Sequence, residues 1–358
     1  MVRSIHVLGS HLPGGAESFF ARLVQALTRA GQPTLAVIRG DSPVVQALTS
    51  DVEQVRLPML NNYDVYSRWR LTRLVRSWRA DIVQTYMSRA SRLTRLPAGS
   101  HAVHVARLGG YYKIEGYYRH ANAWVGNTRD ICDYLVAHQL PPQQVFHIGN
   151  FVPLPRSVSQ AELSALRATL KLPGNAFVLF ALGRLVAAKG FQDLLEAFAR
   201  LGPTVDGRPL VLVIAGDGAE RDALAEATRS LGLAQRVRWV GWQNDPTPFY
   251  ALGEVFVCPS RHEPLGNVIL EAWQRRMPVV STLNEGARQI AQDGHNALLA
   301  PLADPAGLAE ALQRLFAMRP EERRHLADAG HATVQREHNE EAVVAAYLKM
   351  YEQLGHRA

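Results

Sequence analysis

The chain has 358 residues, of which 47% are hydrophobic and 20% charged. This globular composition excludes a mainly disordered, collagen-like or coiled-coil protein, and the length predicts two domains. The net charge of +7 is unevenly distributed, because residues 1–150 contain 17 Lys/Arg and 9 Asp/Glu whereas residues 151–358 contain 22 Lys/Arg and 23 Asp/Glu. The basic excess of the first part indicates nucleic acid, an anionic membrane surface or an anionic substrate as partner.

The first 150 residues alternate short apolar strands with amphipathic helices. Strands are predicted near Ser4–Leu8, Thr34–Ile38, Ile82–Thr85, Val103–Arg107 and Ala123–Gly126. Helices are predicted between them, among them Ala16–Ala30, Ser67–Arg79 and Thr128–Gln139. The two prolines of the next segment, Asn150–Pro155, indicate a stiff linker between domains.

The same alternation starts again after this linker. Further strands are predicted at Ala176–Leu182, Val211–Ala215, Val237–Val240, Val255–Val257, Val279–Ser281 and Ala297–Leu299. Phe191–Leu201 and Glu340–Leu354 are predicted helices, and no strand follows the last one. Short apolar strands that alternate with helices imply parallel sheets covered on both faces, so the predicted fold class is α/β with two doubly wound, Rossmann-like domains. Ligands of such sheets bind beyond the carboxyl ends of the strands.

A loop with two cations follows the strand that ends at Leu182. Gly183 and Gly190 permit unusual backbone geometry on either side of this loop. Arg184 and Lys189 place a guanidinium and an ammonium group five residues apart at the strand end. Two fixed cations suit a diphosphate. A surface turn with solvated cations is the alternative that the residues alone leave open.

A second loop leads from a strand into a helix that begins near Leu265–Gly266. Backbone amides at a helix start form a ready anion site. Glu263 precedes this helix, and Glu271 lies about a turn and a half into it and leans toward its start. Carboxylates accept hydrogen bonds from hydroxyls and do not help to bind phosphate, so this pair beside an anion site suits a nucleotide-sugar. Helix capping or compensation of the helix dipole is the alternative.

Two other glycine-rich segments lack the residues of known nucleotide motifs. The segment from Gly9 to Gly15 has no Lys and no Ser/Thr after its glycines, which argues against an NTPase loop. The segment from Gly216 to Gly218 lacks the third glycine of a dinucleotide fingerprint. The sequence contains no His-Glu-x-x-His, Cys-x-x-Cys or Gly-x-Ser-x-Gly motif. No metal site is therefore predicted.

Cysteine usage and hydropathy indicate the compartment. Cys132 and Cys258 are far apart in sequence, which disfavours a secreted disulfide scaffold and indicates a reducing cytoplasm. The N-terminus lacks the apolar region of a signal peptide. No run of 18 apolar residues occurs, so no membrane-spanning helix is predicted.

Arg184 and Lys189 followed by Glu263-x7-Glu271, within the segment Glu-Pro-Leu-Gly-Asn-Val-Ile-Leu-Glu-Ala, resemble the donor site of the retaining glycosyltransferases of family 4. The resemblance covers nearly the whole chain. It implies the GT-B fold, with two domains that face each other across a cleft. Residues 1–153 would be the acceptor-side domain, to which a C-terminal helix at 340–358 crosses back, and residues 154–339 would bind the nucleotide-sugar donor.

The resemblance also implies roles for individual residues. Arg184 and Lys189 would bind the donor diphosphate and stabilise the leaving group, Glu263 would contact the donor sugar, and Glu271 the ribose. The base would pack near Trp242. Further contacts to the donor would come from Gly183, Leu265, Gly266, Asn267 and Val268. The turn Gly14–Gly15 would close over the diphosphate from the other domain.

The first domain leaves its contact to the donor sugar open. Many members of the family have a histidine near the end of the strand Val103–Arg107 that touches the donor sugar, and the resemblance implies that His104 or Arg107 would fill that role here. A hydrogen-bonded core histidine is the alternative for His104. Asn127 ends the next strand and either faces the cleft or caps a helix.

A basic patch is predicted on the helix Ser67–Arg79, opposite the face that carries its apolar residues. Trp69, Arg73 and Arg76 form this patch on the helix, and Arg89, Arg92 and Arg95, further along the chain, are expected to extend it. An exposed Trp among arginines suits an anionic membrane surface. A phosphorylated sugar acceptor would use the same arginines, and a solvated basic face is the remaining alternative.

The resemblance therefore implies a retaining, metal-independent hexosyltransferase without a cofactor, which uses a nucleotide-sugar as co-substrate, a UDP-sugar before a GDP-sugar. The expected acceptor is lipid-linked or a polysaccharide of the bacterial cell surface, such as lipopolysaccharide. The expected place is the cytoplasmic face of the inner membrane, with an anionic membrane surface and no nucleic acid as partner. The alternatives are a GT-B sugar-nucleotide epimerase, which the Glu-x7-Glu pattern disfavours, and a catalytically dead basic scaffold that binds a membrane or nucleic acid, which the intact site residues disfavour.

Overall fold

The computed structural model describes residues 1–12, 14–97 and 99–355. The chain forms two compact units. Unit 1 comprises Met1–Phe151 together with the segment that starts at Glu337, and unit 2 comprises Val152–Arg336. Unit 2 is thus inserted into the sequence of unit 1, and the boundaries expected from the sequence lie a few residues further along the chain.

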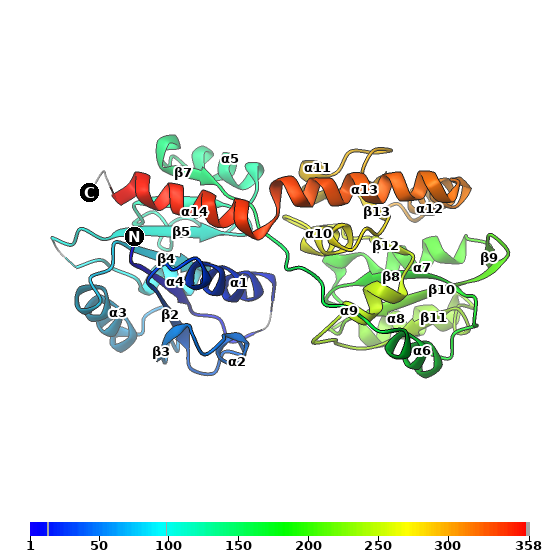
Figure 1. The fold of residues 1–358 in the computed structure, drawn as a ribbon, viewed down its shortest axis with the longest axis horizontal. Helices are drawn as coiled ribbons and strands as arrows, with labels where there is room; N and C mark the ends of the chain where they lie inside the picture. The colour runs from blue at the N-terminus through cyan, green and yellow to red at the C-terminus, as the bar shows by residue number, and fades with distance from the viewer. Residues whose placement is uncertain (13, 98, 356–358) are drawn as a thin grey trace. The chain divides into compact units, whose positions relative to one another are not determined.

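Unit 1 is built on a parallel sheet, which has seven strands in the described residues (Figure 1). The strands are β1 (Ser4–Leu8), β2 (Thr34–Arg39), β3 (Glu53–Leu57), β4 (Ile82–Tyr86), β5 (Val103–Leu108), β6 (Ala123–Gly126) and β7 (Val145–His147). Their spatial order is β3-β2-β1-β4-β5-β6-β7. The order reverses between β1 and β4, which is the switch point of a doubly wound sheet.

Helices cover both faces of the sheet of unit 1. They are α1 (Gly15–Arg29), α2 (Val44–Ala47), α3 (Val65–Ser77), α4 (Met87–Leu93), α5 (Arg129–Ala137), the 3-10 turn Pro142–Gln144 and α14 (Glu340–Gly355). Successive side chains of a strand point to opposite faces, so Leu8 packs with α1 and α14 whereas Val7 packs with α3 and α4. Helix α5 packs on Ala106 and Leu108 of β5.

Unit 2 repeats this architecture. Its strands, within the described range, are β8 (Phe177–Leu182), β9 (Thr204–Val205), β10 (Arg208–Ala215), β11 (Val237–Trp239), β12 (Val255–Cys258), β13 (Val279–Thr282) and β14 (Leu298–Ala300). Six of them form a parallel sheet in the order β11-β10-β8-β12-β13-β14, and β9 pairs with β10 in antiparallel fashion. The switch point of this sheet lies between β8 and β12.

The helices of unit 2 also form two layers. They are α6 (Gln160–Thr169), the 3-10 turn Ala187–Lys189, α7 (Phe191–Ala199), α8 (Arg221–Ser230), α9 (Thr247–Leu252), α10 (Asn267–Gln274), α11 (Glu285–Ile290), α12 (Pro305–Ala317) and α13 (Pro320–Glu337). Side chains of α7, α8 and α12 pack on one face, and side chains of α9 and α10 on the other. The predicted class, α/β with two doubly wound sheets, is confirmed.

Strand β3 was not among the predicted strands, and its place in the sheet explains why. It pairs only with β2, at the edge of the sheet of unit 1. Its sequence Glu-Gln-Val-Arg-Leu buries only Leu57 fully, because an edge strand has one exposed side. The hydrophobic pattern of a central strand is therefore missing.

Candidate active site

Two loops meet at the switch point of unit 2. One follows β8 and runs from Gly183 to Gly190, and the other follows β12 and runs from Pro259 to Gly266. The backbone amides of Arg261 and His262 both donate to the carbonyl oxygen of Ala188, at 2.9 and 3.0 Å. The two cation- and carboxylate-bearing segments that the sequence singled out are therefore bound to each other through their main chains.

Gly190 is required for this close approach. Its φ of +63° lies in the left-handed region, and a Cβ atom added there would lie 2.1 Å from the carbonyl oxygen of Pro259. Gly216, which follows β10, is equally constrained, because an added Cβ would lie 1.9 Å from the carbonyl oxygen of Gly183. The loops after β8, β10 and β12 are thus packed backbone against backbone at one edge of the sheet.

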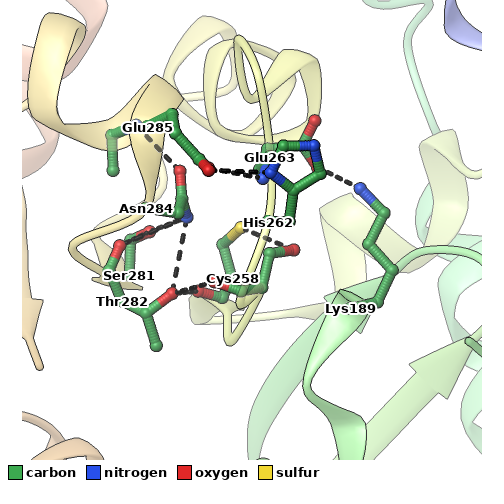
Figure 2. A network of polar contacts seen from close by, with 10 residues as sticks. Lys189, Cys258, His262, Glu263, Ser281, Thr282, Asn284 and Glu285 are labelled. Carbon is green, nitrogen blue, oxygen red and sulfur yellow. Dashed lines mark hydrogen bonds and ion pairs between the residues drawn. The ribbon is translucent and has the colours of Figure 1, made fainter. Parts of the chain in front are cut away.

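Lys189 and Glu263 face each other across these loops, and Nζ of Lys189 forms an ion pair with Oε2 of Glu263 (Figure 2). The two side chains are 18% and 16% exposed. The main chain of Glu263 is fixed as well, because its amide donates to Oε2 of Glu285 at 3.1 Å and its carbonyl accepts from the amide of Gly286 at 2.7 Å. The structure thus brings together two predicted site residues.

A second ion pair ties the loop after β12 to helix α7. The guanidinium group of Arg261 donates two hydrogen bonds to the buried carboxylate of Asp193, at 2.6 and 2.7 Å. Two parallel hydrogen bonds fix the orientation of the guanidinium group relative to the carboxylate as well as the distance between them. The segment that carries Glu263 is held on both sides of that residue.

Glu285 is a site residue that the sequence analysis missed. Figure 2 shows it beside His262, and Oε1 of Glu285 lies 2.7 Å from Nδ1 of His262. Burial raises the pKa of the Glu285 carboxyl, but the hydrogen bonds from His262 and from backbone amides lower it more, and the net pKa lies below its ordinary value. Glu285 follows Asn284, whose side chain caps α11, and this Asn-Glu pair is the sequence signal that marks the helix start.

Helix α10 begins at the end of the second loop. Gly266 precedes it in the left-handed conformation, with φ of +82°, and Leu265 is buried next to it. Because the first amides of a helix have no partner within the helix, the backbone at Asn267 and Val268 is suited to an anion. The predicted backbone site therefore lies directly after the loop that carries Glu263.

Glu271 lies further along α10. Oε2 of Glu271 accepts a hydrogen bond of 3.2 Å from the hydroxyl of Tyr250. Burial, followed by the nearby Glu271 carboxylate, raises the pKa of that hydroxyl well above its ordinary value, so that Tyr250 keeps its proton and donates it. The guanidinium of Arg275 lies 4.5 Å over the Tyr250 ring.

The remaining predicted donor residues lie at the same edge of the sheet. Arg184 is exposed and comes directly after Gly183. Trp242 follows the end of β11, is 49% exposed, and its indole N–H donates to Asn244 at 3.0 Å. The structure therefore places all of the predicted donor residues of unit 2 in segments that follow the carboxyl ends of β8, β11 and β12.

In unit 1, Gly14 and Gly15 stand at the start of α1. Glu17, a residue that the sequence analysis did not consider, lies beside them and is only 6% exposed. A Cβ atom added to Gly14 would lie 2.7 Å from Oε2 of Glu17. An acid in the first turn of a helix that follows two glycines is the signal that identifies this position in the sequence.

The three polar candidates of unit 1 are all buried. Arg107 donates to the hydroxyl of Tyr347 at 3.2 Å and lies 4.1 Å over the ring of Phe19, so it packs between the sheet, α1 and α14. Nε2 of His104 lies 3.0 Å from the hydroxyl of Thr85. These contacts fit the alternative interpretation of His104, a hydrogen-bonded core histidine.

Asn127 differs from these two residues. It is 4% exposed, and within the described part of the chain its Oδ1 has no hydrogen-bond partner. The cap of helix α5 is the neighbouring Thr128, whose side chain accepts from the amide of Ile131. Asn127 is therefore not the helix cap that the sequence left open as an alternative.

The residues of the predicted basic patch differ in their exposure and in their contacts. Trp69 is 51% exposed, and the guanidinium of Arg73 lies 5.4 Å from its ring. Arg89, expected to extend this patch, is instead partly buried and donates to the carbonyl oxygens of Gly9 and Met59, at 3.1 and 3.2 Å. It bridges the segments that follow β1 and β3, and a guanidinium group has enough N–H groups to satisfy both carbonyls.

In residues 1–12, 14–97 and 99–355, no three His, Cys, Asp or Glu side chains are grouped so that they can hold a metal ion. In the same ranges, every helix is too short or too polar to span a membrane.

Two family models together match most of the chain. Residues 176–318 match "Glycosyl transferases group 1", and residues 13–156 match "Glycosyltransferase Family 4". The lipopolysaccharide core biosynthesis glycosyltransferase LpsE of Rhizobium meliloti (strain 1021) is 36% identical over 343 residues, which cover 94% of this chain and 95% of that protein. LpsD of the same strain is 33% identical over 347 residues, with 95% of each chain covered.

Solved structures share the fold at low sequence identity. The Anabaena protein HepE in complex with UDP and glucose is similar with a TM-score of 0.83 and 19% identity, over 99% of this chain and 100% of that chain. WaaG, a glycosyltransferase involved in lipopolysaccharide biosynthesis, is similar with a TM-score of 0.71 and 18% identity, over 96% of this chain and 99% of that chain. The predicted GT-B fold is thereby confirmed.

Proposed function

This chain belongs to the glycosyltransferases of family 4, and from that premise we propose that it transfers a hexose from a nucleotide-sugar to a lipid-linked or polysaccharide acceptor, with retention of the anomeric configuration. The acceptor belongs to a bacterial surface glycan of the lipopolysaccharide core kind, because the relatives LpsE and LpsD are named for that pathway. UDP is the favoured nucleotide, and the Anabaena neighbour bound to UDP-glucose supports this choice.

The observation that carries the proposal is the arrangement of Lys189, Glu263 and the start of α10 at one switch point. Lys189 and Arg184 bind the diphosphate, together with the amides from Leu265 to Val268. Glu263 accepts hydrogen bonds from hydroxyls of the donor sugar, and Glu271 accepts from the ribose. A nucleotide-sugar requires hydrogen-bond donors for its phosphates and hydrogen-bond acceptors for its hydroxyls, next to each other in one site.

The reaction breaks the bond between the anomeric carbon and the diphosphate oxygen and forms a bond from that carbon to the acceptor oxygen. Negative charge develops on the departing diphosphate, and fixed cations and amides aimed at it lower the barrier. The acceptor hydroxyl attacks on the face that the diphosphate leaves, and its proton passes to a diphosphate oxygen. Arg184 and Lys189 supply the positive charge, so the proposed reaction proceeds without a metal ion and continues in excess chelator.

We assign the acceptor to unit 1. Gly14 and Gly15 at the start of α1 provide a backbone suited to an anion. Of the candidate side chains on this side, Arg107 and His104 have hydrogen-bond partners within unit 1, whereas Oδ1 of Asn127 has none in the described residues, so Asn127 is the strongest candidate. An acceptor hydroxyl can donate to such an oxygen.

We further propose that the protein works as a peripheral enzyme at the cytoplasmic face of an anionic membrane. The start of α3 exposes the apolar residues Val65, Tyr66 and Trp69, which are 75%, 55% and 51% exposed. Arg73 and Arg76 are exposed two turns or less further along the same helix. Apolar side chains flanked by arginines suit the interface of an anionic bilayer.

A panel of nucleotide-sugars tests this function. A cognate donor raises the melting temperature by mass action, and NMR of the product reports the anomeric configuration. An inverted product contradicts retention, and failure of every donor to bind contradicts the transferase. Turnover of the donor sugar without any acceptor would instead support the epimerase alternative. Nucleic-acid or vesicle binding without donor affinity would support the catalytically dead scaffold.

A further inference from the structure

Arginine side chains without acidic partners gather between helices α3 and α4. From Arg68 to Arg95 the chain contains eight arginines and one acid, Asp81. Within the described residues, Arg68, Arg92 and Arg95 form no ion pair with a carboxylate. A charge that is partly withdrawn from water is stabilised by a counter-charge, and Arg92 and Arg95 are partly buried, so this unbalanced group suits an anionic ligand.

Arg92 is held in place by two aromatic rings. Its guanidinium carbon lies 4.6 Å from the ring centre of Tyr63 and 5.2 Å from that of Tyr117. One Nη1–H donates to the carbonyl oxygen of Gly116 at 2.9 Å. Stacking and a single hydrogen bond fix the plane of the guanidinium and leave other N–H groups of the fork to bind a ligand.

Arg95 lies three residues after Arg92, and its segment contacts helix α3. Its Nη1 donates to the carbonyl oxygen of Thr94 at 2.9 Å and contacts Nε2 of His120. Thr72 of α3 donates to the carbonyl oxygen of Arg95 at 3.2 Å, and Arg68 lies one turn before Thr72. The row of α3 that contains Arg68 therefore faces the segment that contains Arg95.

The electrostatic consequence of this arrangement is repulsion. Burial lowers the pKa of Arg95 first, and the charges of Arg68 and Arg92 lower it further. Burial likewise lowers the pKa of His120, and the charge of Arg95 adds to that effect. The fold brings three guanidinium groups together against their mutual repulsion, and a bound anion removes that repulsion.

We propose that Arg68, Arg92 and Arg95 form a subsite for a phosphate group on the acceptor saccharide. A phosphate oxygen pair matches the planar fork of each guanidinium. Tyr63, which is 74% exposed, offers an apolar ring to the attached sugar. The subsite deepens the proposed transferase function, because the phosphate is that of its acceptor, but binding of phosphate by these arginines does not depend on catalysis.

The test measures binding of glucose 6-phosphate, and of glucose as its neutral counterpart, to the full-length protein by calorimetry. We expect wild-type protein to prefer glucose 6-phosphate, and R68A/R92A to lose about tenfold in affinity for it. R73A/R76A removes the same charge from the exposed face of α3 and leaves this affinity unchanged. Melting curves and binding of the cognate nucleotide-sugar, both unchanged in R68A/R92A, show that the variant is folded and test the transferase function separately.

Three results overturn the proposal. The first is no preference of wild-type protein for glucose 6-phosphate over glucose. The second is an equal loss of affinity in both double variants, which indicates a general charge effect. The third comes from vesicles of phosphatidylcholine with phosphatidylglycerol: if R68A/R92A loses vesicle binding and keeps glucose 6-phosphate binding, the arginines bind a lipid headgroup and not the phosphate of a saccharide.

Discussion

Lys189 and Glu263 are 74 residues apart in sequence and form an ion pair at the switch point of unit 2. The sequence assigned them to different parts of the donor, Lys189 to the diphosphate and Glu263 to the sugar. The ion pair makes them one unit, because each side chain holds the other in place. On the proposed function, a diphosphate bound by Lys189 would share the ammonium group with Glu263, so the same pair would position the donor phosphate and the donor sugar.

Replacement of Lys189 by alanine should remove a charge that the leaving diphosphate needs. We expect kcat to fall by about 10²–10³, the usual effect of losing one group that stabilises developing negative charge. Transfer assays with the cognate donor measure this, and exposed Lys349→Ala is the control. A kcat within a factor of two of wild type would refute the role of Lys189.

Glu263→Gln should weaken binding of the donor sugar more than binding of the nucleotide. The substitution keeps the shape of the side chain and removes the charge that strengthens hydrogen bonds from sugar hydroxyls. Calorimetry should show a loss of about 1.5–3 kcal/mol in binding of the nucleotide-sugar, and a smaller loss for the free nucleotide. Equal losses for both ligands would place the effect of Glu263 on the diphosphate instead.

Glu271→Ala tests the contact to the ribose. The wild-type protein should bind UDP more tightly than 2′,3′-dideoxy-UDP, by roughly 10–100-fold, if two hydroxyls donate to a carboxylate. The variant should bind both nucleotides with similar, weaker affinity. Exposed Glu310→Ala serves as the control. If the variant still discriminates the two nucleotides, the ribose is bound elsewhere.

Reversal of charge on the exposed face of α3 should weaken membrane binding. We expect R73E/R76E to sediment poorly with vesicles that contain phosphatidylglycerol, since repulsion replaces attraction at the lipid surface. Its activity on a soluble acceptor should survive. R200E/R324E carries the same charge change at exposed positions of unit 2. Vesicle binding that is equal in wild type and R73E/R76E removes the docking proposal.

Buried histidines of unit 1 should make the protein acid-sensitive. Burial lowers the pKa of His6 from 6.5 to about 3, so the folded state keeps this imidazole neutral while the unfolded state takes up a proton near pH 6.5. The stability that this difference provides is complete above pH 6.5 and is lost as the pH falls from there toward 3. The unfolded state binds more protons in this window, so the free energy of unfolding must decrease.

The measurement is the slope of the unfolding free energy against pH between pH 6 and 4. Loss of one such histidine lowers the slope by at most about 1.4 kcal/mol per pH unit. His6→Gln should show this smaller slope, whereas His325→Gln, at an exposed position, should keep the wild-type slope. Identical slopes in all three proteins would show that His6 is not the titrating group.

The buried central strands and the two site loops were predictable, because buried parallel strands are short apolar runs and ligands bind beyond their carboxyl ends. The pairing of Lys189 with Glu263 was predictable as a neighbourhood only, since two loops after adjacent strands meet at one edge. The tie between Arg261 and Asp193 was not predictable. It depends on how helix α7 leaves the first loop, which the spacing of residues does not encode.

The first unit was harder to interpret for a physical reason. His104 and Arg107 lie near the two ends of a central strand, where ligand-binding and core residues have the same sequence signal. Arg107 packs against Tyr347 of α14, more than 200 residues later in the chain. Arg89 similarly has the sequence signal of a solvent-exposed arginine, and only its bonds to Gly9 and Met59 show its different role.

The insertion of unit 2 into unit 1 has a consequence for biosynthesis. Helix α14 supplies Val343, Tyr347 and Tyr351 to the same apolar core as Phe19 of α1. During translation, all of Val152–Arg336 is synthesised before these residues, and domains generally fold as units as they emerge from the ribosome. Unit 1, whose synthesis begins first, is therefore the unit whose hydrophobic core is completed last.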